Sequence, residues 1–360
     1  MPRNARSGTV ISILLSFASF LSLLQLFDPL QSTDVPQSVL ERGLADFKGL
    51  SRATRFNSTT LDSQDRILWL LQDAGVALSS LSEEERQQLP KWQHVIDLYG
   101  DDIIVHGQEQ CETFRQHVPN PKDRILAVAG LFNTGTNLLN TQFTRNIQGI
   151  KTLWQVPWGK HRMAQVKWEH TAHEMEQHNK EHVLPVVIIR DPLAWMQSMC
   201  ANPYAAKWRH GTHHCPNLVP DELDRQFYRH LPNDSAFGVR VKYDAESQFE
   251  FDSLAHLWSD YHLQYMNADY PVLFIRYEDL VFQPKQVLTQ IAHCVGATVR
   301  EPLRYQINTS KNHGSGTNWI RAITKTASAE LRKHNLTADD ITYLHQHLDA
   351  SLMDLFQYPI

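Results

Sequence analysis

A glycine-bearing loop contains the residues of this sequence whose types and spacing point most directly to chemistry. The segment from Gly130 to Asn137 reads GLFNTGTN, and it lies between the apolar run ILAVA and the helix-like stretch LLNTQFTRN. At such a corner the backbone N–H groups converge and the helix dipole is positive, which favours a phosphate or sulfate group. Gly130 and Gly135 have the spacing of a Walker A loop, but Thr136 stands where that motif has lysine. The sequence therefore predicts an anion-binding loop, with an ordinary strand-to-helix turn as the alternative.

A second candidate anion ligand, Arg190, ends another apolar run. This run reads VLPVVIIR, and Ser198 lies eight positions after Arg190 in the helix-like segment DPLAWMQSMC. An arginine at the carboxyl end of a strand offers a planar fork of donors to a phosphate, and a serine two turns into the next helix adds a hydroxyl donor. The alternative is a strand-end salt bridge between Arg190 and Asp191, with Asp191 also capping the helix.

Together these two segments resemble the phosphate-binding motifs of sulfotransferases that use 3'-phosphoadenosine-5'-phosphosulfate (PAPS). The 5'-phosphosulfate loop of that family is close to G-x-x-[RK]-[ST]-G-T-[ST]-L-L. In the family's 3'-phosphate motif an arginine ends a strand and a serine follows eight positions later, as Arg190 and Ser198 do. The resemblance covers residues 121–300, and the loop residues that match are Thr134, Gly135, Thr136, Leu138 and Leu139.

The resemblance implies a set of residues that contact PAPS. A third segment, RYEDLVFQP, resembles the Y-E-D-L strand end of the family and implies that Tyr277 lies near the adenine; a buried tyrosine with a backbone partner is the alternative. A late loop, SKNHGSG, suits a cover over the 3'-phosphate, with a solvated surface loop as the alternative. The cofactor-binding residues so implied are Asn133, Thr134, Gly135, Thr136, Asn137, Arg190, Ser198, Tyr277 and Lys311.

The loop departs from the family at one position. Asn133 stands where the family usually has a basic residue, whose side chain helps to neutralise the transferring group. Another cation has to substitute if the chain is active, and Lys160 and Lys311 are the candidates. Without such a substitute the chain would bind its ligands with weak turnover or none.

Sulfuryl transfer also needs a group that accepts the proton of the attacking hydroxyl, and histidine suits a neutral or mildly acidic compartment. His161 is the first candidate, because the segment WQVPWGKH combines it with Lys160 and with two tryptophans that suit a sugar face, Trp154 and Trp158. The predicted catalytic residues are therefore His161 and Lys160, with a surface histidine as the alternative. The next candidates for the base are His170 and Glu169.

Three apolar runs, each followed by a loop and a helix-like stretch, predict the fold class. They span residues 125–130, 183–190 and 271–277. This repetition is typical of an α/β protein with a three-layer α/β/α arrangement around a central parallel sheet. The resemblance implies the P-loop NTPase-like sulfotransferase fold. Helix signals include a capping box at Ser82 and Glu85, and Pro284 and Gly296 as the start and end of one helix.

The N-terminal residues predict a membrane anchor. The segment Val10–Phe27 has no charged residue and is preceded by Arg3 and Arg6, so it can span a bilayer with the N-terminus in the cytoplasm. A cleaved signal peptide is the alternative. The predicted organisation is a cytoplasmic tail (1–8), a transmembrane signal anchor (9–27), a stem (28–60), a helical region (61–118) and a catalytic domain (119–360).

Composition narrows the class of partner and the compartment. The net charge of −5 argues against a nucleic-acid binder, and four N-glycosylation sequons are usable only in the secretory pathway. There an oxidising environment favours a disulfide between Cys200 and Cys215, with two free buried thiols as the alternative. Histidines cluster at residues 170–182 and 210–214, but neither group has the spacing of a known metal motif, so no metal is predicted.

These features lead to one functional hypothesis and two alternatives. The hypothesis is a type II, single-pass Golgi sulfotransferase that moves the sulfuryl group of PAPS to a hydroxyl of an acceptor, with a luminal glycan as the favoured acceptor. One alternative is a glycan- or nucleotide-binding protein of the same fold without turnover, and the other is a small-molecule kinase. The sequence leaves the oligomeric state open.

Overall fold

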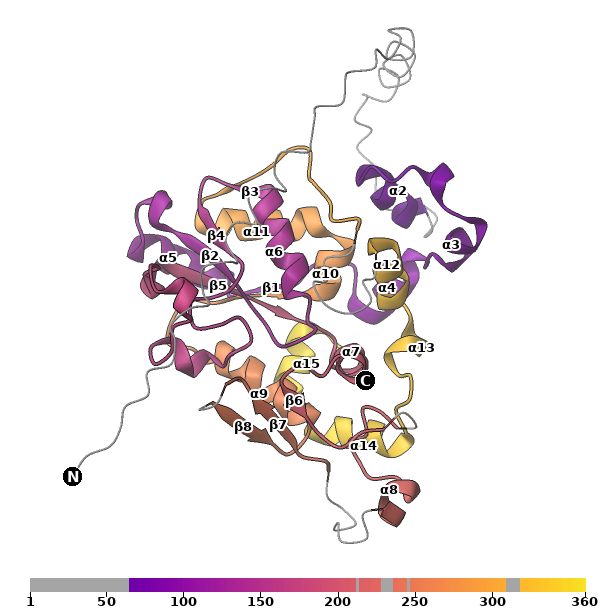
Figure 1. Ribbon diagram of the computed structural model, residues 1–360. Coiled ribbons are helices and arrows are strands. Elements are labelled where there is room, and N and C mark those ends of the chain that lie inside the picture. The colour runs from indigo at the N-terminus through magenta and orange to yellow at the C-terminus, as the bar shows by residue number, and fades with distance from the viewer. Residues whose placement is uncertain (1–64, 212–213, 228–235, 245–246, 309–317) are drawn as a thin grey trace, which may run out of the picture. The chain divides into compact units, whose positions relative to one another are not determined.

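The computed structural model describes residues 65–211, 214–227, 236–244, 247–308 and 318–360, and all of them belong to the unit Leu61–Ile360 (Figure 1). The predicted cytoplasmic tail (1–8), anchor (9–27) and stem (28–60) lie outside the described residues, as does Lys311. Within the described ranges, none of the helices combines the length and the apolar character needed to span a bilayer.

A five-stranded mixed sheet forms the centre of this unit, with the strand order β1-β9-β5-β2-β4. β9, β5, β2 and β4 run parallel, and the short edge strand β1 pairs antiparallel with β9. The α/β class is as predicted, but the sheet is mostly rather than wholly parallel. The strands are β1 (Val105–His106), β2 (Ile125–Ala129), β4 (Lys151–Leu153), β5 (Val183–Ile189) and β9 (Leu273–Arg276).

The three strands predicted from the sequence are the three central ones. Every residue of β2, β5 and β9 is buried, since helices cover the sheet and both faces of these strands must be apolar. Their carboxyl ends carry the glycine loop, Arg190 and Tyr277 in turn. Because parallel strands end at the same edge of a sheet, this order brings the three segments together.

Helices flank the sheet, with α6 and α11 on one side of it and α9 and α15 on the other in Figure 1. The predicted capping box of Ser82 and Glu85 begins α3, and Pro284 and Gly296 lie at the start and end of α11, as predicted. The helices are α2 (Asp65–Asp73), α3 (Glu83–Gln88), α4 (Trp92–Tyr99), α5 (Cys111–His117), α6 (Thr136–Asn146), α7 (Pro192–Ala201), α8 (Glu222–Phe227), α9 (Leu254–Met266), α10 (Tyr277–Phe282), α11 (Pro284–Val295), α12 (Trp319–Thr326), α13 (Ala329–Arg332), α14 (Ala338–His347) and α15 (Ala350–Phe356).

Two small antiparallel sheets and several short 3₁₀ helices complete the described fold. One sheet pairs β3 (Ile147–Gln148) with β10 (Thr298–Val299), and the other has the order β6-β7-β8. Its strands are β6 (Ala206–Lys207), β7 (Val239–Lys242) and β8 (Gln248–Phe251). The 3₁₀ helices are η1 (Leu78–Ser80), η2 (Gln108–Gln110), η3 (Pro121–Asp123), η4 (Ala164–Lys167), η5 (His173–Met175) and η6 (Lys180–His182).

The helical region before β2 is joined to the rest of the unit through Arg276, a fully buried residue at the end of β9. Its guanidinium pairs with Asp279 at 2.7 Å and donates to the carbonyl oxygens of Tyr99 and Asp102. Breaking a buried pair of this kind is costly, because it leaves a charge without compensation. Arg276 therefore fixes the corner between β9 and α10, where Tyr277 begins the helix.

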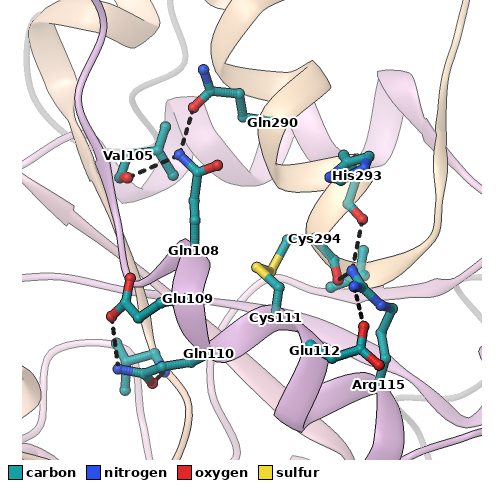
Figure 2. The surroundings of a disulfide bond; sticks show 12 residues. Val105, Gln108, Glu109, Gln110, Cys111, Glu112, Arg115, Gln290, His293 and Cys294 are labelled. Atoms are coloured by element: carbon teal, nitrogen blue, oxygen red, sulfur yellow. Dashed lines mark hydrogen bonds and ion pairs between the residues drawn. A yellow bond between two sulfur atoms is a disulfide. The ribbon is translucent and has the colours of Figure 1, made fainter.

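Two disulfides pair all four cysteines. Cys200 and Cys215 are bonded, as predicted, and they tie the end of α7 to the loop that follows it. The second bond was not predicted: it joins Cys111 in α5 to Cys294 in α11 over 183 positions of sequence (Figure 2). Beside it, Arg115 donates to the carbonyl oxygen of Cys294 at 2.9 Å, so a cation also caps the end of α11.

A buried histidine fixes the loop that follows the Cys200–Cys215 bond. Nε2 of His214 lies 2.7 Å from Oδ2 of Asp340 in α14, and Nδ1 lies 3.4 Å from Asp221 and 3.7 Å from Asp224. Burial opposes the charged form of this ring, but the bond to Asp340 and the charges of the other two carboxylates outweigh it. The pKa of His214 is therefore raised above its usual value.

We expect the His214→Gln substitution to lower stability more at pH 6 than at pH 9. A histidine whose pKa is raised by folding contributes stability that is fully present below its unfolded pKa of about 6.5 and is lost as the pH rises through the folded value. Urea unfolding of both proteins at the two pH values measures the difference. His94→Gln, at an exposed position on α4, is the control, and an equal loss at both pH values would contradict the charged state of His214.

Candidate functional site

A cavity of about 430 Å³ lies where the glycine loop, α7, α10 and α12 meet. Its size is in the range of small-molecule sites. Nine of the residues predicted from the sequence line it, although they come from segments far apart in the chain. These residues are Asn133, Gly135, Thr136, Asn137, Lys160, His161, Arg190, Ser198 and Tyr277.

The glycine loop can take its shape only with glycine at two positions. Gly135 has a φ of 99°, and a Cβ atom there would lie 2.5 Å from Cδ2 of Tyr277. At Gly130 a Cβ atom would lie 2.9 Å from the backbone oxygen of Ile188. The chain therefore passes close to β5 and α10 and enters α6 with its first N–H groups unpaired within the helix. That arrangement suits an anion at the helix N-terminus.

Thr134 was also predicted to bind the cofactor, but it does not line the cavity. Its side chain is fully buried, and its hydroxyl donates to the carbonyl oxygen of Leu131 at 2.8 Å. Its backbone N–H bonds to the same oxygen. Thr134 thus holds the turn of the loop from inside, while the neighbouring Thr136 faces the cavity.

Arg190 is held by the loop and by α7. Nη1 of Arg190 donates to the carbonyl oxygen of Asn133 at 2.9 Å and to Oγ of Ser198 at 3.0 Å. Its Cζ atom lies 4.6 Å from the centre of the Tyr277 ring. Nε of Arg190 is buried and has no hydrogen-bond partner among the described residues. A buried donor left in this way is expected to be satisfied by a ligand or water.

The alternative role for Arg190, a salt bridge with Asp191, is not found. Asp191 pairs instead with Arg332 at 2.6 Å, and its carboxylate caps α7 by accepting from the N–H groups of Leu193 and Ala194. The charge of Asp191 is therefore balanced by another arginine. Arg190 keeps its positive charge available to the cavity.

His161 lines the cavity, and its ring is hydrogen-bonded to the glycine loop. Its Nδ1 lies 2.7 Å from the carbonyl oxygen of Gly130. A carbonyl can only accept, so Nδ1 carries the proton and Nε2 of the neutral ring carries the lone pair. Burial, together with the charge of Lys160, lowers the pKa of His161 to about 3. The ring is therefore neutral at any physiological pH.

Lys160 and Asn133 take different places beside the loop. Nζ of Lys160 donates to Oδ1 of Asn137 at 3.0 Å, and burial lowers the pKa of Lys160. The Asn133 side chain donates to the carbonyl oxygen of Asn202 at 2.8 Å, and its backbone has a φ of 62°. Lys160 thus brings a cation to the first turn of α6, whereas Asn133 ties the loop to the end of α7.

The charge of the cavity is strongly one-sided. Lys160, Arg190 and Lys325 bring positive charge to its wall, and no aspartate or glutamate is among the described residues that line it. The protein as a whole has a net charge of −5. A partly enclosed cavity whose charged side chains are all positive concentrates the electric field and attracts anions.

The two tryptophans predicted to face a sugar lie in different environments. Trp154 lines the cavity and is 44% exposed. Trp158 is fully buried, and its indole N–H donates to the Tyr265 hydroxyl at 2.9 Å, so the prediction for Trp158 is wrong. The second-choice bases, Glu169 and His170, are not among the lining residues of the cavity.

Sequence reasoning missed part of the cavity wall. Phe132 lies inside the predicted loop and packs against His161, with the ring centres 4.7 Å apart. The other missed residues come from outside the motifs, several of them from α12, and no spacing in the sequence marks them. They are Tyr204, Gln306, Asn308, Trp319, Ala322, Lys325 and Thr326, whereas Leu138, which also lines the cavity, belongs to the loop motif.

The histidine clusters noted in the sequence separate in the structure. Within the described ranges, His214, Asp221 and Asp224 form the one group whose possible ligand atoms all lie within 4.8 Å of one another. Their contacts are those of the ion-pair cluster around His214 described above. His170, His173, His178 and His182 belong to no such group among the described residues.

Comparison of the chain with protein-family models, curated proteins and solved structures finds no match. The chemistry of the cavity is therefore inferred from its own residues. They combine a glycine loop at a helix N-terminus, three cations and a neutral imidazole, and no carboxylate is among the described lining residues. Such a set can bind a ligand with several negative charges and accept a proton beside it.

Proposed function

We propose that this chain is a sulfotransferase that uses PAPS as its donor and a hydroxyl group as its acceptor. The observation that carries the proposal is the cavity in which the glycine loop and the Arg190–Ser198 pair lie together with further cations, with no carboxylate among the described lining residues. PAPS has negative groups at both the 3' and the 5' side of its adenosine. The proposal also includes a specific fold for this α/β unit, the P-loop NTPase-like sulfotransferase fold.

The described residues fit such a donor. Nε of Arg190 is buried without a partner in the described part of the chain, and it belongs to a guanidinium that already shares a bond with Ser198. These two residues would hold the 3'-phosphate. The N-terminus of α6, with Thr136 and Lys160, would hold the 5'-phosphosulfate, and Tyr277 would contact the nucleoside. When bound, PAPS supplies the sulfuryl group.

The role of the chain in transfer is to position the acceptor and to handle its proton. Nε2 of His161 accepts the proton of the acceptor hydroxyl, because Nδ1 is already bonded to Gly130. Lys160 and the α6 N-terminus stabilise negative charge that develops on the transferring group and on the leaving phosphate. Lys160 thereby takes over from the basic residue that is replaced by Asn133.

We expect Lys160→Met to lower kcat by about 100- to 1000-fold, the usual effect of losing one donor to developing charge. Binding of 3'-phosphoadenosine-5'-phosphate (PAP), which lacks the sulfuryl group, should change much less. Initial rates and PAP titrations measure the two effects. Lys160→Arg is the matched control that keeps the charge, and equal loss of PAP binding and turnover in Lys160→Met would contradict the role given to Lys160.

A glycan is the favoured acceptor. Trp154 is a large exposed aromatic ring at the cavity, and aromatic faces with a polar edge suit sugars. We propose that the chain acts in the Golgi lumen as a type II membrane protein. Two disulfides that use every cysteine support an oxidising compartment. Nucleic acid is not an expected partner, given the net charge of −5.

A second candidate function is binding of a glycan or nucleotide without turnover. It is favoured by Asn133, whose side chain is neutral and is bonded to the carbonyl oxygen of Asn202. A kinase is disfavoured, because a Mg²⁺–nucleotide complex needs a carboxylate or similar oxygen ligands. No carboxylate is found among the described residues of the cavity wall.

Transfer of labelled sulfate from PAPS to a panel of luminal glycans tests the proposal. We expect PAP and PAPS to bind in preference to ATP, and label to appear in at least one glycan. Binding of PAPS without transfer to any acceptor class would favour the second candidate. Binding of ATP but not of PAPS would overturn the proposal.

A further inference from the structure

A second hollow lies beside β8 and α9 and differs from the first in its chemistry. This groove, of about 640 Å³, is lined by residues of η4, β8, α9 and the segment that follows α9. We propose that it binds an uncharged stretch of an oligosaccharide chain, so that the chain is held outside the reacting sugar. This inference rests on the proposed glycan acceptor. The residues that carry it are Met163, Trp168, Glu250, Asp260, Asp269 and Tyr270.

Trp168 provides a fixed aromatic platform in the groove. It is 54% exposed, so its ring face is open to a ligand. Nζ of Lys167 lies 4.5 Å from the centre of the Trp168 ring and 3.7 Å from that of Tyr270. Lys167 itself is only 3% exposed, so this cation holds the two rings from inside the protein. A ring held in this way loses little freedom when a flat sugar face packs on it.

Hydrogen-bond acceptors surround this platform. Asp260, Gln264, Asn267 and Asp269 all line the groove. Oε1 of Gln264 is buried and has no hydrogen-bond partner within the described ranges. Sugar hydroxyls are donors that can satisfy carboxylate and amide oxygens, and buried acceptors without partners are costly. The combination of an aromatic face with surrounding acceptors is suited to a pyranose ring.

The charge of the groove selects an uncharged chain. Asp260 and Asp269 line it, as does Glu250, which pairs with Arg240 at 3.0 Å, and no lysine, arginine or histidine is among its described lining residues. A sulfated or uronate-bearing chain would be repelled by these carboxylates. The cavity has the opposite character, since its described lining residues include cations but no carboxylate. The two hollows would therefore separate the anionic donor from an unsulfated acceptor chain.

Neighbouring residues of the chain line the two hollows. His161 belongs to the cavity and Met163 to the groove, and two residues of extended chain span at most about 7 Å. The segment between them is fixed, because the Tyr265 hydroxyl donates to the carbonyl oxygen of Arg162 at 3.1 Å. The Tyr270 hydroxyl donates to that of Ala164, also at 3.1 Å. A short, fixed segment of backbone thus links the wall of the cavity to that of the groove, and in the proposed complex the groove binds sugars next to the one that is modified.

Direct binding to neutral oligosaccharides tests the groove. The probes are hexasaccharides of glucose, mannose and N-acetylglucosamine and an O-sulfated form of each, titrated by calorimetry. We expect at least one neutral probe to bind, with its sulfated form at least tenfold weaker. Trp168→Ala should weaken binding at least tenfold, and Trp168→Phe should keep part of the affinity. Trp69→Ala, at a tryptophan that is 51% exposed elsewhere, is the matched control.

Either of two results would overturn the proposal for the groove: no neutral probe binds, or Trp168→Ala binds the neutral probes as well as the wild type does. Either result leaves the sulfotransferase proposal to be judged by PAP binding, which does not involve the groove. Conversely, Arg190→Ala should no longer bind PAP but should still bind the oligosaccharide. In transfer assays we expect Trp168→Ala to raise KM for a long acceptor with little change in kcat. An equal fall in kcat would point to a general disturbance of the fold instead.

Discussion

Arg190→Ala should weaken binding of PAP by at least about 100-fold, to the point where calorimetry detects none. Removing one member of a buried, charged hydrogen-bond pair costs about 2–5 kcal/mol, and 100-fold corresponds to about 2.7 kcal/mol. In this protein Arg190 is 8% exposed, shares a bond with Ser198 and has a buried Nε without a partner among the described residues. Its loss removes the guanidinium that we assign to the 3'-phosphate.

Two further variants make this result specific. Arg190→Lys keeps the charge but not the planar fork, so it should recover only part of the affinity. Arg240→Ala removes an exposed arginine that pairs with Glu250, and it should bind PAP as the wild type does. Thermal unfolding of each variant shows whether the fold is retained. If a folded Arg190→Ala protein bound PAP with wild-type affinity, the assignment of Arg190 to the 3'-phosphate would be wrong.

His161→Ala should lower kcat by about 10²- to 10⁴-fold, the usual range for loss of a general base, while PAP binding stays within a few-fold of wild type. Because the pKa of His161 is lowered to about 3, the base form is fully present in the free enzyme at pH 5. The value of kcat/KM reports the free enzyme. We therefore expect no decline in kcat/KM from protonation of His161 between pH 7 and pH 5.

The control for His161 is His170→Ala, because His170 is the other histidine considered as the base and does not line the cavity. Its kcat should be close to that of the wild type. Initial rates from pH 4 to pH 8 test both statements, with acceptor well below KM to give kcat/KM and with saturating acceptor to give kcat. An acid limb in the pH profile that disappears in His170→Ala would instead assign the role of base to His170.

The central strands and the main loop could be predicted because local sequence determines them. Strands covered on both faces are continuous apolar runs, and β2, β5 and β9 are found where such runs occur. The edge strand β1 has only two residues, and β4 has three. Runs this short carry no usable periodicity. Without β1, the sequence could not reveal that the sheet is mixed.

The candidate site was predictable where a motif has a fixed spacing and unpredictable where only the fold brings residues together. Arg190 and Ser198 are eight positions apart, and they are hydrogen-bonded in the structure. Trp319 and Lys325 reach the cavity from α12, far from the motifs. Trp158 lies in the same segment as His161, yet it is buried against Tyr265. Composition alone does not separate a tryptophan that faces a cavity from one in the core.

The disulfides illustrate the same limit. Cys200 and Cys215 are 15 positions apart, and a short loop suggests the pair. The bond between Cys111 and Cys294 depends on α5 packing against α11, which no local pattern predicts. The sequence leaves such a pairing open, since four cysteines allow three connectivities.

The Cys111–Cys294 bond has a consequence for biosynthesis. The ribosome synthesises α5 long before α11, because 183 positions of sequence separate Cys111 from Cys294. Cys111 therefore has no native partner until these residues have been added. During that time Cys200 and Cys215 are synthesised and compete for the same thiol. Native pairing therefore requires that the nearer two cysteines react with each other first, or that an isomerase corrects the exchange. Recombinant protein from a reducing cytosol is expected to lack the tie between α5 and α11, so production should be directed to an oxidising compartment.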